Sequence, residues 1–194
     1  MDFEEKIKKA IMADPANQAF NDKGYIPLFS AHPEAKIILI GQAPGIRAQE
    51  SGQLWQDKSG QRLMGFLGVD EETFFNPQIF AHIPMDFYFP GKGKSGDKKP
   101  RKAFAKKWHP QVLAHIKAPQ LTLLIGQSAQ DFYLKGDGRK NLTDRVRHYK
   151  DYLPDYFPLV HPSPRNQIWT HKNPWFEKEV LPDLRDRVQK IINS

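Results

Sequence analysis

Cysteine is absent from this chain of 194 residues. A protein without cysteine has no disulfide, no thiol nucleophile, no thiolate zinc site and no iron–sulfur cluster. The sequence also lacks an apolar run of the roughly eighteen residues that a membrane-spanning helix needs, so we expect no membrane partner. The first residues, Met1 to Lys6, carry acids where a signal peptide carries bases, so we expect a cytoplasmic protein.

The sequence also lacks the spacing of residues that is typical of a metal site. The seven histidines are scattered without the pairing of a zinc site, and we expect neither a metal nor a cofactor. There is no internal repeat and no linker-like stretch between two halves, so residues 1–194 are predicted to form a single domain, and we expect a monomer. Hydrophobic residues make up 39% and charged residues 26%, which is typical of a soluble globular protein rather than a disordered chain.

Positive charge is present in excess, and it is concentrated in one place. The segment 92–107 holds eight Lys and Arg residues against one acid, Asp97, and so carries a charge equal to the formal net charge of +7. A neutral body with one basic segment containing Gly and Pro is typical of a loop that faces a polyanion. A solvated lysine loop without a partner is the alternative. The candidate polyanion-binding residues of this segment are Lys98, Lys99, Arg101 and Lys102.

Short apolar runs bounded by glycine, proline or polar residues predict the strands. They occupy 35–40 and 121–125, with weaker candidates at 78–84 and 156–160. Helical spacing of apolar residues predicts helices at 3–12, 60–67, 104–116, 128–134 and 176–192. Strands that alternate with helices indicate an α/β fold, here a three-layer α/β/α arrangement with a central, mostly parallel four-stranded sheet. In such sheets the ligand site lies at the carboxyl ends of the strands.

Two polar loops follow the first and the last predicted strand. Residues 41–45 read GQAPG, a tight turn whose glycines let a ligand approach the backbone. Residues 161–166 read HPSPRN, in which two prolines restrict the backbone while the other four side chains supply donors and acceptors. A lone histidine is more often structural than catalytic, so the whole loop, rather than His161 alone, indicates a functional site.

Both loops, in this order and at these strand ends, resemble the two signature motifs of the uracil-DNA glycosylase superfamily. Residues 41–45 are similar to its water-activating and base-binding loop. Residues 161–166 are similar to its histidine loop, which ends in a DNA-intercalating segment, and have the letters of the single-strand-selective monofunctional branch. Residues 52–60 resemble the segment in which an aromatic residue, here Trp55, stacks on the flipped base. With a match at 124–129 to the third strand and its helix start, the resemblance spans 36–173.

The sequence departs from this family at the position of the catalytic carboxylate. Other branches carry Asp or Asn where this chain has Ala43, or Glu where it has Gln42. The resemblance implies Asp57 as the substitute carboxylate, with a helix N-cap as its alternative role. Branches that read uracil with an Asn on the second strand imply a reader near Ala81 or His82, and we predict His82, with a structural histidine as the alternative.

The chemistry of base removal gives each of these residues a predicted role. His161 donates to the departing base oxygen, and Asp57 orients the water and tolerates the cationic sugar. Trp55 forms an aromatic wall for the unstacked base, with core packing as its alternative role. The other predicted contacts are the backbone N–H groups of Gln42 and Ala43 to the base, Asn166 to the substrate or to its own turn, and Ser163, Arg165, Lys98, Lys99, Arg101 and Lys102 to DNA.

The function predicted from these residues is that of a monofunctional DNA glycosylase in base-excision repair. Its reaction is hydrolysis of the N-glycosidic bond of uracil, or of a related deaminated or 5-substituted base, in single- or double-stranded DNA. Neither motif holds a Schiff-base lysine, and Gly45 leaves space where the family often has a bulky Tyr. A catalytically silent nucleic-acid-binding protein with a glycosylase-like pocket is the alternative, favoured by Ala43 and Gln42, and an enzyme acting on a free nucleoside is a third.

Overall fold

The computed structural model describes residues 2–139 and 141–194, and four of its segments pair into one sheet. The strands are β1 (Ile37–Ile40), β2 (Phe80–His82), β3 (Leu121–Ile125) and β4 (Tyr156–Leu159). Their order across the sheet is β2-β1-β3-β4, and each neighbouring pair is parallel. The four predicted strands are therefore confirmed, and the pairing of these strands is wholly rather than mostly parallel.

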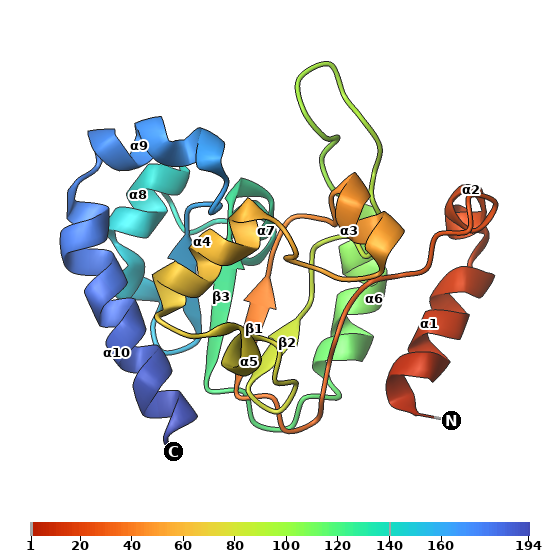
Figure 1. The fold of residues 1–194 in the computed structure, drawn as a ribbon, viewed down its shortest axis with the longest axis horizontal. Coiled ribbons are helices and arrows are strands. Elements are labelled where there is room, and N and C mark those ends of the chain that lie inside the picture. The colour runs from red at the N-terminus through yellow and green to blue at the C-terminus, as the bar shows by residue number, and fades with distance from the viewer. Residues whose placement is uncertain (1, 140) are drawn as a thin grey trace.

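Helices cover both faces of this sheet (Figure 1). The α-helices are α1 (Phe3–Ala13), α2 (Gln18–Asn21), α3 (Ile46–Ser51), α4 (Lys58–Leu67), α5 (Glu71–Phe74), α6 (Lys102–Leu113), α7 (Gln127–Tyr133), α8 (Leu142–Arg147), α9 (Gln167–Lys172) and α10 (Leu181–Ile192). The shorter turns are η1 (Pro15–Asn17), η2 (Tyr149–Tyr152), η3 (Pro164–Asn166) and the π-helical η4 (Phe176–Val180). Within the described parts of the chain, no helix has the length and apolar character needed to cross a membrane.

The five predicted helices are present as α1, α4, α6, α7 and the η4–α10 pair. Sequence periodicity missed α2, α3, α5, α8 and α9, which have only four to six residues each. A helix of one or two turns shows too few repeats of the 3.6-residue period to be recognised from its apolar spacing.

Each face of the sheet packs against its own set of helices, and the sheet and the two sets of helices form three layers. Ile38 and Ile40 of β1 belong to a core that α1, α6 and α7 complete, whereas Ile37 and Leu39 belong to a core that α4, α8 and α10 complete. All four side chains are buried. A strand buried on both faces reads as a continuous apolar run, because successive side chains point to opposite sides. The predicted α/β/α arrangement is thus confirmed.

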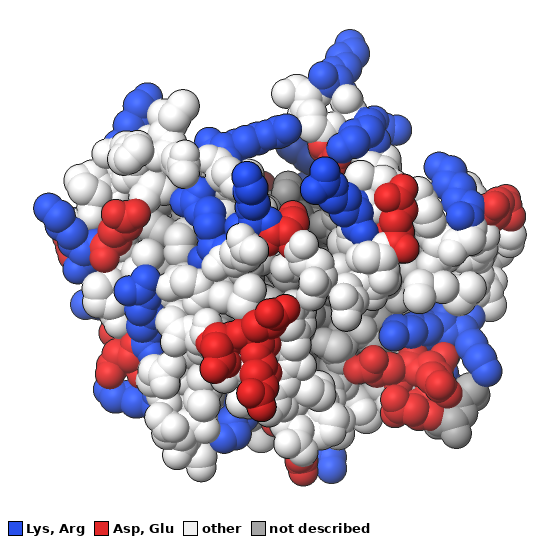
Figure 2. Space-filling model, viewed as in Figure 1, with Lys and Arg blue, Asp and Glu red and all other residues white. Residues whose placement is uncertain are grey.

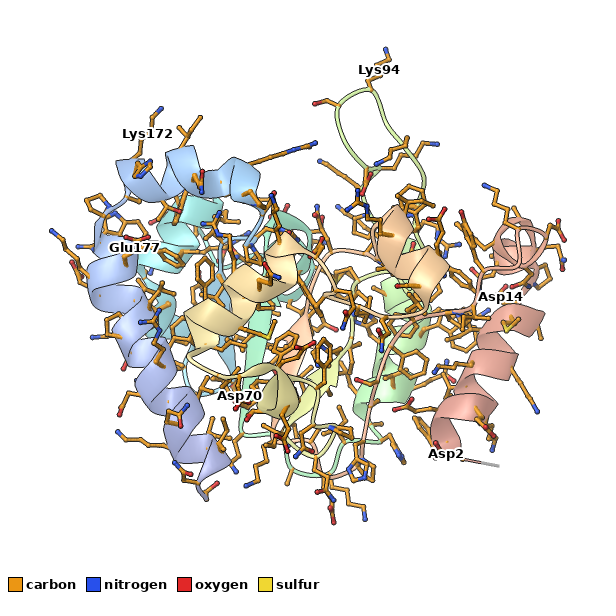
Figure 3. All side chains as sticks on the ribbon, in the orientation of Figure 1. Asp2, Asp14, Asp70, Lys94, Lys172 and Glu177 are labelled. Carbon is orange, nitrogen blue, oxygen red and sulfur yellow. The ribbon has the colours of Figure 1, made fainter. Side chains whose placement is uncertain are left out.

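The basic segment 92–107 is part loop and part helix, which corrects the prediction of a single basic loop. Residues 91–98 form a narrow loop closed by a hydrogen bond from the N–H of Lys98 to the carbonyl of Gly91 at 2.8 Å. This loop projects beyond the carboxyl end of the sheet (Figure 1), with Lys94 near its tip (Figure 3). From Lys102 onward the chain is α6, because its apolar residues recur at helical spacing and Trp108 is buried against the sheet.

Candidate active site

A cavity with a volume of about 680 Å³ lies at the carboxyl end of the sheet. The loops that follow β1 and β4 both contribute to its wall, as the topology of a parallel sheet requires. The predicted site residues that line it are Gln42, Ala43, Trp55, Asp57, His161, Ser163, Arg165 and Lys98. Residues more than a hundred positions apart in the sequence therefore meet around one space.

His161 stands two residues beyond the end of β4, and its own loop fixes its tautomer. The N–H of Ser163 donates to Nδ1 of His161 at 3.2 Å, so in the neutral ring Nδ1 is the acceptor and Nε2 carries the proton. Burial holds the pKa of His161 below its usual value, although the negative charge of Asp57 raises that pKa in part. The side chain is thus a neutral donor at neutral pH, and it lines the cavity.

The ring of Trp55 lies opposite His161. The two ring centroids are 6.1 Å apart and the planes are tilted by 33°. Trp55 is partly buried, lines the cavity and also packs against the core formed with α4 and α10. Trp55 therefore has the packing role, and since it also lines the cavity its stacking on a base stays a prediction.

Asp57 is the N-cap of α4. Its Oδ1 accepts a hydrogen bond from the N–H of Gly60 at 3.0 Å, which confirms the geometry of the capping role. The same carboxylate lines the cavity and acts electrostatically on His161. A cap uses one carboxylate oxygen and leaves the second available to a ligand or water. Its part in orienting water stays a prediction.

The 41–45 loop lines the cavity and leaves space beside Gly45. Gln42, Ala43 and Gly45 all line the cavity, and the carbonyl of Gln42 accepts from the N–H of Asp86 at 3.2 Å. A methyl group built on Gly45 would meet nothing within 4 Å. The space predicted at Gly45 is therefore present in the structure.

His82 does not reach the cavity, so its prediction as the base reader needs correction. The side chain is 5% exposed, Nε2 lies 3.0 Å from the carbonyl oxygen of Phe74, and the ring packs against Phe74 and Phe75. Burial lowers the pKa of His82 to about 4. In the pleat of β2 its side chain points to the face covered by α5, away from the site, and the structural alternative describes it.

Asn166 closes its own loop. Its Nδ2 donates to the carbonyl of His161 at 2.8 Å, and it is not part of the cavity wall. Ser163 does line the cavity, and its hydroxyl accepts from the N–H of Arg165 at 3.3 Å. The structure therefore supports the alternative role of Asn166, in which it holds the turn that presents His161, and gives no support to the predicted substrate contact.

Arg101 is a second correction, because its guanidinium is already engaged. Nε and Nη2 donate to the two carboxylate oxygens of Asp86 at 2.7 and 2.9 Å, and Nη1 donates to Oδ1 of Asn17 at 2.9 Å. The Asp86 side chain is fully buried. The same guanidinium lies 4.5 Å from the ring centroid of Phe20 and 4.9 Å from that of Phe104. These contacts assign Arg101 to anchoring the base of the projecting loop, and we no longer expect it to be a principal phosphate ligand.

The other predicted DNA contacts are exposed. Lys98 and Arg165 line the cavity, whereas Lys99 and Lys102 are exposed outside it. The Nη1 atom of Arg165 lies 3.2 Å from the position that a Cβ of Gly96 would occupy. The histidine loop and the projecting loop therefore approach each other at the cavity mouth.

Two arginines near the site were missed by the sequence reasoning. Arg47, near the start of α3, lines the cavity, and Arg62 of α4 donates from Nη1 to the carbonyl of Ser163 at 3.1 Å. Arg47 follows the 41–45 loop directly, so the rule that sites lie beyond strand ends could have found it. Arg62 lies 101 residues before its partner, and nothing local in the sequence indicates that contact.

The charge distribution agrees with this geometry. Figure 2 shows Lys and Arg side chains gathered along the upper edge of the molecule, over the carboxyl end of the sheet, while the largest groups of Asp and Glu lie lower on this face. Lys94 on the projecting loop and Lys172 on α9 both lie at this upper edge (Figure 3). Within the described part of the chain, no cluster of His, Asp and Glu is arranged to hold a metal ion.

A comparison with protein families matches this chain to one of them. The family is described as the Uracil DNA glycosylase superfamily, and its match covers residues 29–185, most of the chain. The matched part includes both loops that form the cavity, together with Trp55, Asp57 and His161.

Proposed function

The chain belongs to the uracil DNA glycosylase superfamily, and we propose that it is a monofunctional glycosylase that removes uracil or a related base from DNA. One observation carries the proposal. A neutral histidine with its proton on Nε2, an aromatic ring and a carboxylate surround one cavity. This set matches the three requirements of N-glycosidic bond hydrolysis: a donor for the departing base, a wall for it, and a group that orients water.

The bond that breaks joins C1′ of the deoxyribose to the ring nitrogen of the base. The base leaves with the electron pair, and Nε2–H of His161 donates to the base oxygen on which negative charge develops. A neutral donor suits this step, because its N–H stabilises the anion through a hydrogen bond without the ring first having to take up a proton. Asp57 orients the water whose oxygen bonds to C1′ and stabilises positive charge on the sugar, and the proton lost by that water balances the charge of the base.

The cavity also has the means to hold the phosphates on either side of an extruded base. Arg47 of α3, Lys98 of the projecting loop and Arg165 of η3 line it from three different segments. Lys92, which also lines it, is paired with Asp97 at 2.7 Å and contributes less net charge. Cations at the mouth of a cavity neutralise backbone phosphates while the base enters, which favours DNA over a free nucleoside.

Gly45 supports the finer proposal that bases with a substituent at the 5-position are accepted. The space beside it is empty to 4 Å, so the cavity has no side chain there to exclude a methyl or hydroxymethyl group. A steric contact with one such group discriminates by about 1–3 kcal/mol, and its absence relaxes selectivity by that amount.

A second candidate function has its own observation. Ala43 stands in the cavity wall where other members of the family carry a polar or acidic residue, and one oxygen of Asp57 is committed to capping α4. A protein that binds DNA through this pocket without cleaving the bond is the function that these two features favour.

Incubation with oligonucleotides that carry one uracil, single- and double-stranded, separates the two functions. The glycosylase is expected to release uracil and to leave a site that breaks only after alkali, with no covalent adduct after borohydride treatment. His161→Ala is the matched control and is expected to lower the rate about 100-fold while binding persists. Binding of DNA by the unmodified protein with no release of uracil would instead establish the silent binder.

A further inference from the structure

Trp55 has a backbone conformation that side chains other than glycine rarely adopt. Its φ is +64°, and it is the one residue other than glycine with a positive φ in the part of the chain that the structure describes. Such a conformation is unfavourable by itself and persists where the surrounding structure enforces it. Two glycines contact Trp55 closely, one through its backbone and one through its ring.

Gly60, in the first turn of α4, contacts the backbone. A Cβ on Gly60 would lie 1.8 Å from the carbonyl oxygen of Trp55 and 2.7 Å from the carbonyl carbon. No side chain fits there, so only glycine lets the start of α4 pack directly on that carbonyl. The cap from Asp57 to the N–H of Gly60 ties the same turn to the chain between them.

Gly41, at the end of β1, contacts the ring. A Cβ on Gly41 would lie 3.0 Å from Cζ2 of Trp55 and 3.4 Å from Cη2. The six-membered part of the indole therefore rests against the backbone of β1's end, where any larger residue would push it by a few tenths of an ångström. The other side of the gap is His161, whose ring centroid lies 6.1 Å from that of Trp55.

We propose that Gly41 and Gly60 are positioning residues that fix the Trp55 ring relative to His161 and so set the position of the base between them. This rests on the proposed function, in which the base stacks on Trp55 and receives a hydrogen bond from His161. Displacing a stacking wall by part of an ångström moves the base away from its donor, and such misplacement costs on the order of 10- to 100-fold in rate.

A double-mutant cycle tests the Gly41 contact, because that contact is with the Trp55 side chain. Gly41→Ala is expected to lower the single-turnover rate of uracil release about 10-fold or more, with an unchanged thermal midpoint. In a Trp55→Ala background, the same Gly41→Ala change is expected to have no further effect. An equal cost in both backgrounds, or no cost in the unmodified protein, would overturn the proposal for Gly41.

Gly60 contacts the main chain, so its variant is expected to affect stability as well as rate. Gly60→Ala is expected to lower the rate more than Gly41→Ala in the unmodified protein and to have no further effect on the rate in the Trp55→Ala background, where no ring remains to be positioned. Its loss of stability is expected in both backgrounds, since the carbonyl remains. Gly65→Ala is the matched control on the same helix, where an added methyl meets nothing within 4 Å, and its rate is expected to be unchanged. A Gly60→Ala rate equal to that of Gly65→Ala would overturn the proposal for Gly60. Should Gly60→Ala not fold, the Gly41 cycle decides.

A readout independent of catalysis separates this inference from the proposed function. The emission of Trp55 is isolated as the difference between each protein and its Trp55→Phe counterpart, and its quenching by acrylamide reports the exposure of the ring. Gly41→Ala is expected to change this quenching and Gly65→Ala is not. Unchanged quenching in Gly41→Ala refutes the positioning role even if uracil is released. Changed quenching with no release by the unmodified protein supports the positioning and refutes the glycosylase.

Discussion

The main-chain N–H of Ser163 donates to Nδ1 of His161, two residues back in the same loop, at 3.2 Å. This contact makes Nε2 the protonated nitrogen of the neutral ring. A doubly protonated ring would set its own Nδ1–H against the N–H of Ser163, so the loop and burial both favour the neutral form. Protonation of Nδ1 at low pH would break this contact, so the donor role of His161 in this loop depends on pH.

The pH dependence of uracil release follows from the lowered pKa of His161. The rate is expected to be flat near neutral pH and to fall as the pH drops through a value below the ordinary histidine pKa. Because the charge of Asp57 raises the pKa of His161, Asp57→Asn is expected to move this acid limb to still lower pH. Single-turnover rates measured across the acid range check both. An acid limb at the same pH in both proteins would show that Asp57 does not act on His161.

Asp57 has two roles that substitutions can separate, because it caps α4 and its negative charge acts on His161. Asn is as good an N-cap as Asp, so Asp57→Asn is expected to keep the free energy of unfolding while lowering the rate by less than His161→Ala does. Asp57→Ala is expected to lose about 1 kcal/mol of stability as well as the activity. Urea unfolding and rate measurements on both variants check this. A fully active Asp57→Ala would reduce the residue to a cap alone.

The salt dependence of DNA affinity distinguishes the cations at the cavity from the anchor of the loop. Neutralising Arg47, Lys98 and Arg165 together is expected to flatten the plot of log affinity against log salt by up to about 0.9 per lost phosphate contact. Arg101→Ala is the contrasting variant. It leaves the carboxylate of Asp86 buried and unpaired and is expected to cost about 3–5 kcal/mol of stability. A folded Arg101→Ala protein with a flattened slope would instead make Arg101 a phosphate ligand.

Selectivity at the 5-position depends on Gly45. Cleavage of uracil, hydroxymethyluracil and thymine opposite guanine is to be compared for the unmodified protein and Gly45→Tyr. We expect activity on hydroxymethyluracil beside uracil, and a preferential loss of the bulkier bases in Gly45→Tyr by tens to hundreds of fold. Strict specificity for uracil in the unmodified protein would mean that another group fills the space, and Trp55, which lines the same cavity, is the candidate.

Two buried histidines away from the cavity predict acid sensitivity of the fold. Burial lowers the pKa values of His82 and His109 to about 4, so the unfolded chain binds protons more readily than the folded one between pH 6.5 and 4. Each residue is expected to stabilise the protein at neutral pH and to lose up to a few kcal/mol of that stability as the pH falls through this window. Urea unfolding at several pH values measures the slope. His82→Leu is expected to reduce it, and a change at the exposed His171 is not.

Much of the fold could be predicted from the sequence. The apolar runs that became β1 and β3 are buried on both faces, and a strand of that kind has no polar face to obscure it. The loops that follow β1 and β4 were recognised from their glycine, proline and polar residues, and the parallel sheet then required them to lie at one edge. The short helices α3 and α9 were not predicted, since their few residues show no recognisable repeat of the helical period.

The sequence did not reveal which side chains are free to contact a ligand. His82, Asn166 and Arg101 have residue types suited to ligands and stand near the right loops, yet each is occupied by a partner within the protein. For His82 the pleat of β2 decided the face, and for Arg101 the buried Asp86 captured the guanidinium. A hydrogen bond with a distant partner leaves no trace in local spacing, so sequence reasoning had no means to detect these contacts.

The sequence by itself determined the architecture and the two loops, because periodicity, glycine and proline act locally along the chain. Only the tertiary structure decided which donors face the cavity, since burial pairs most polar groups and leaves few free to meet a ligand. It also decided the place of Trp55, whose ring rests on Gly41 and whose carbonyl lies under Gly60. Those contacts join the end of β1, the 52–57 segment and α4, and they exist only once these elements have packed.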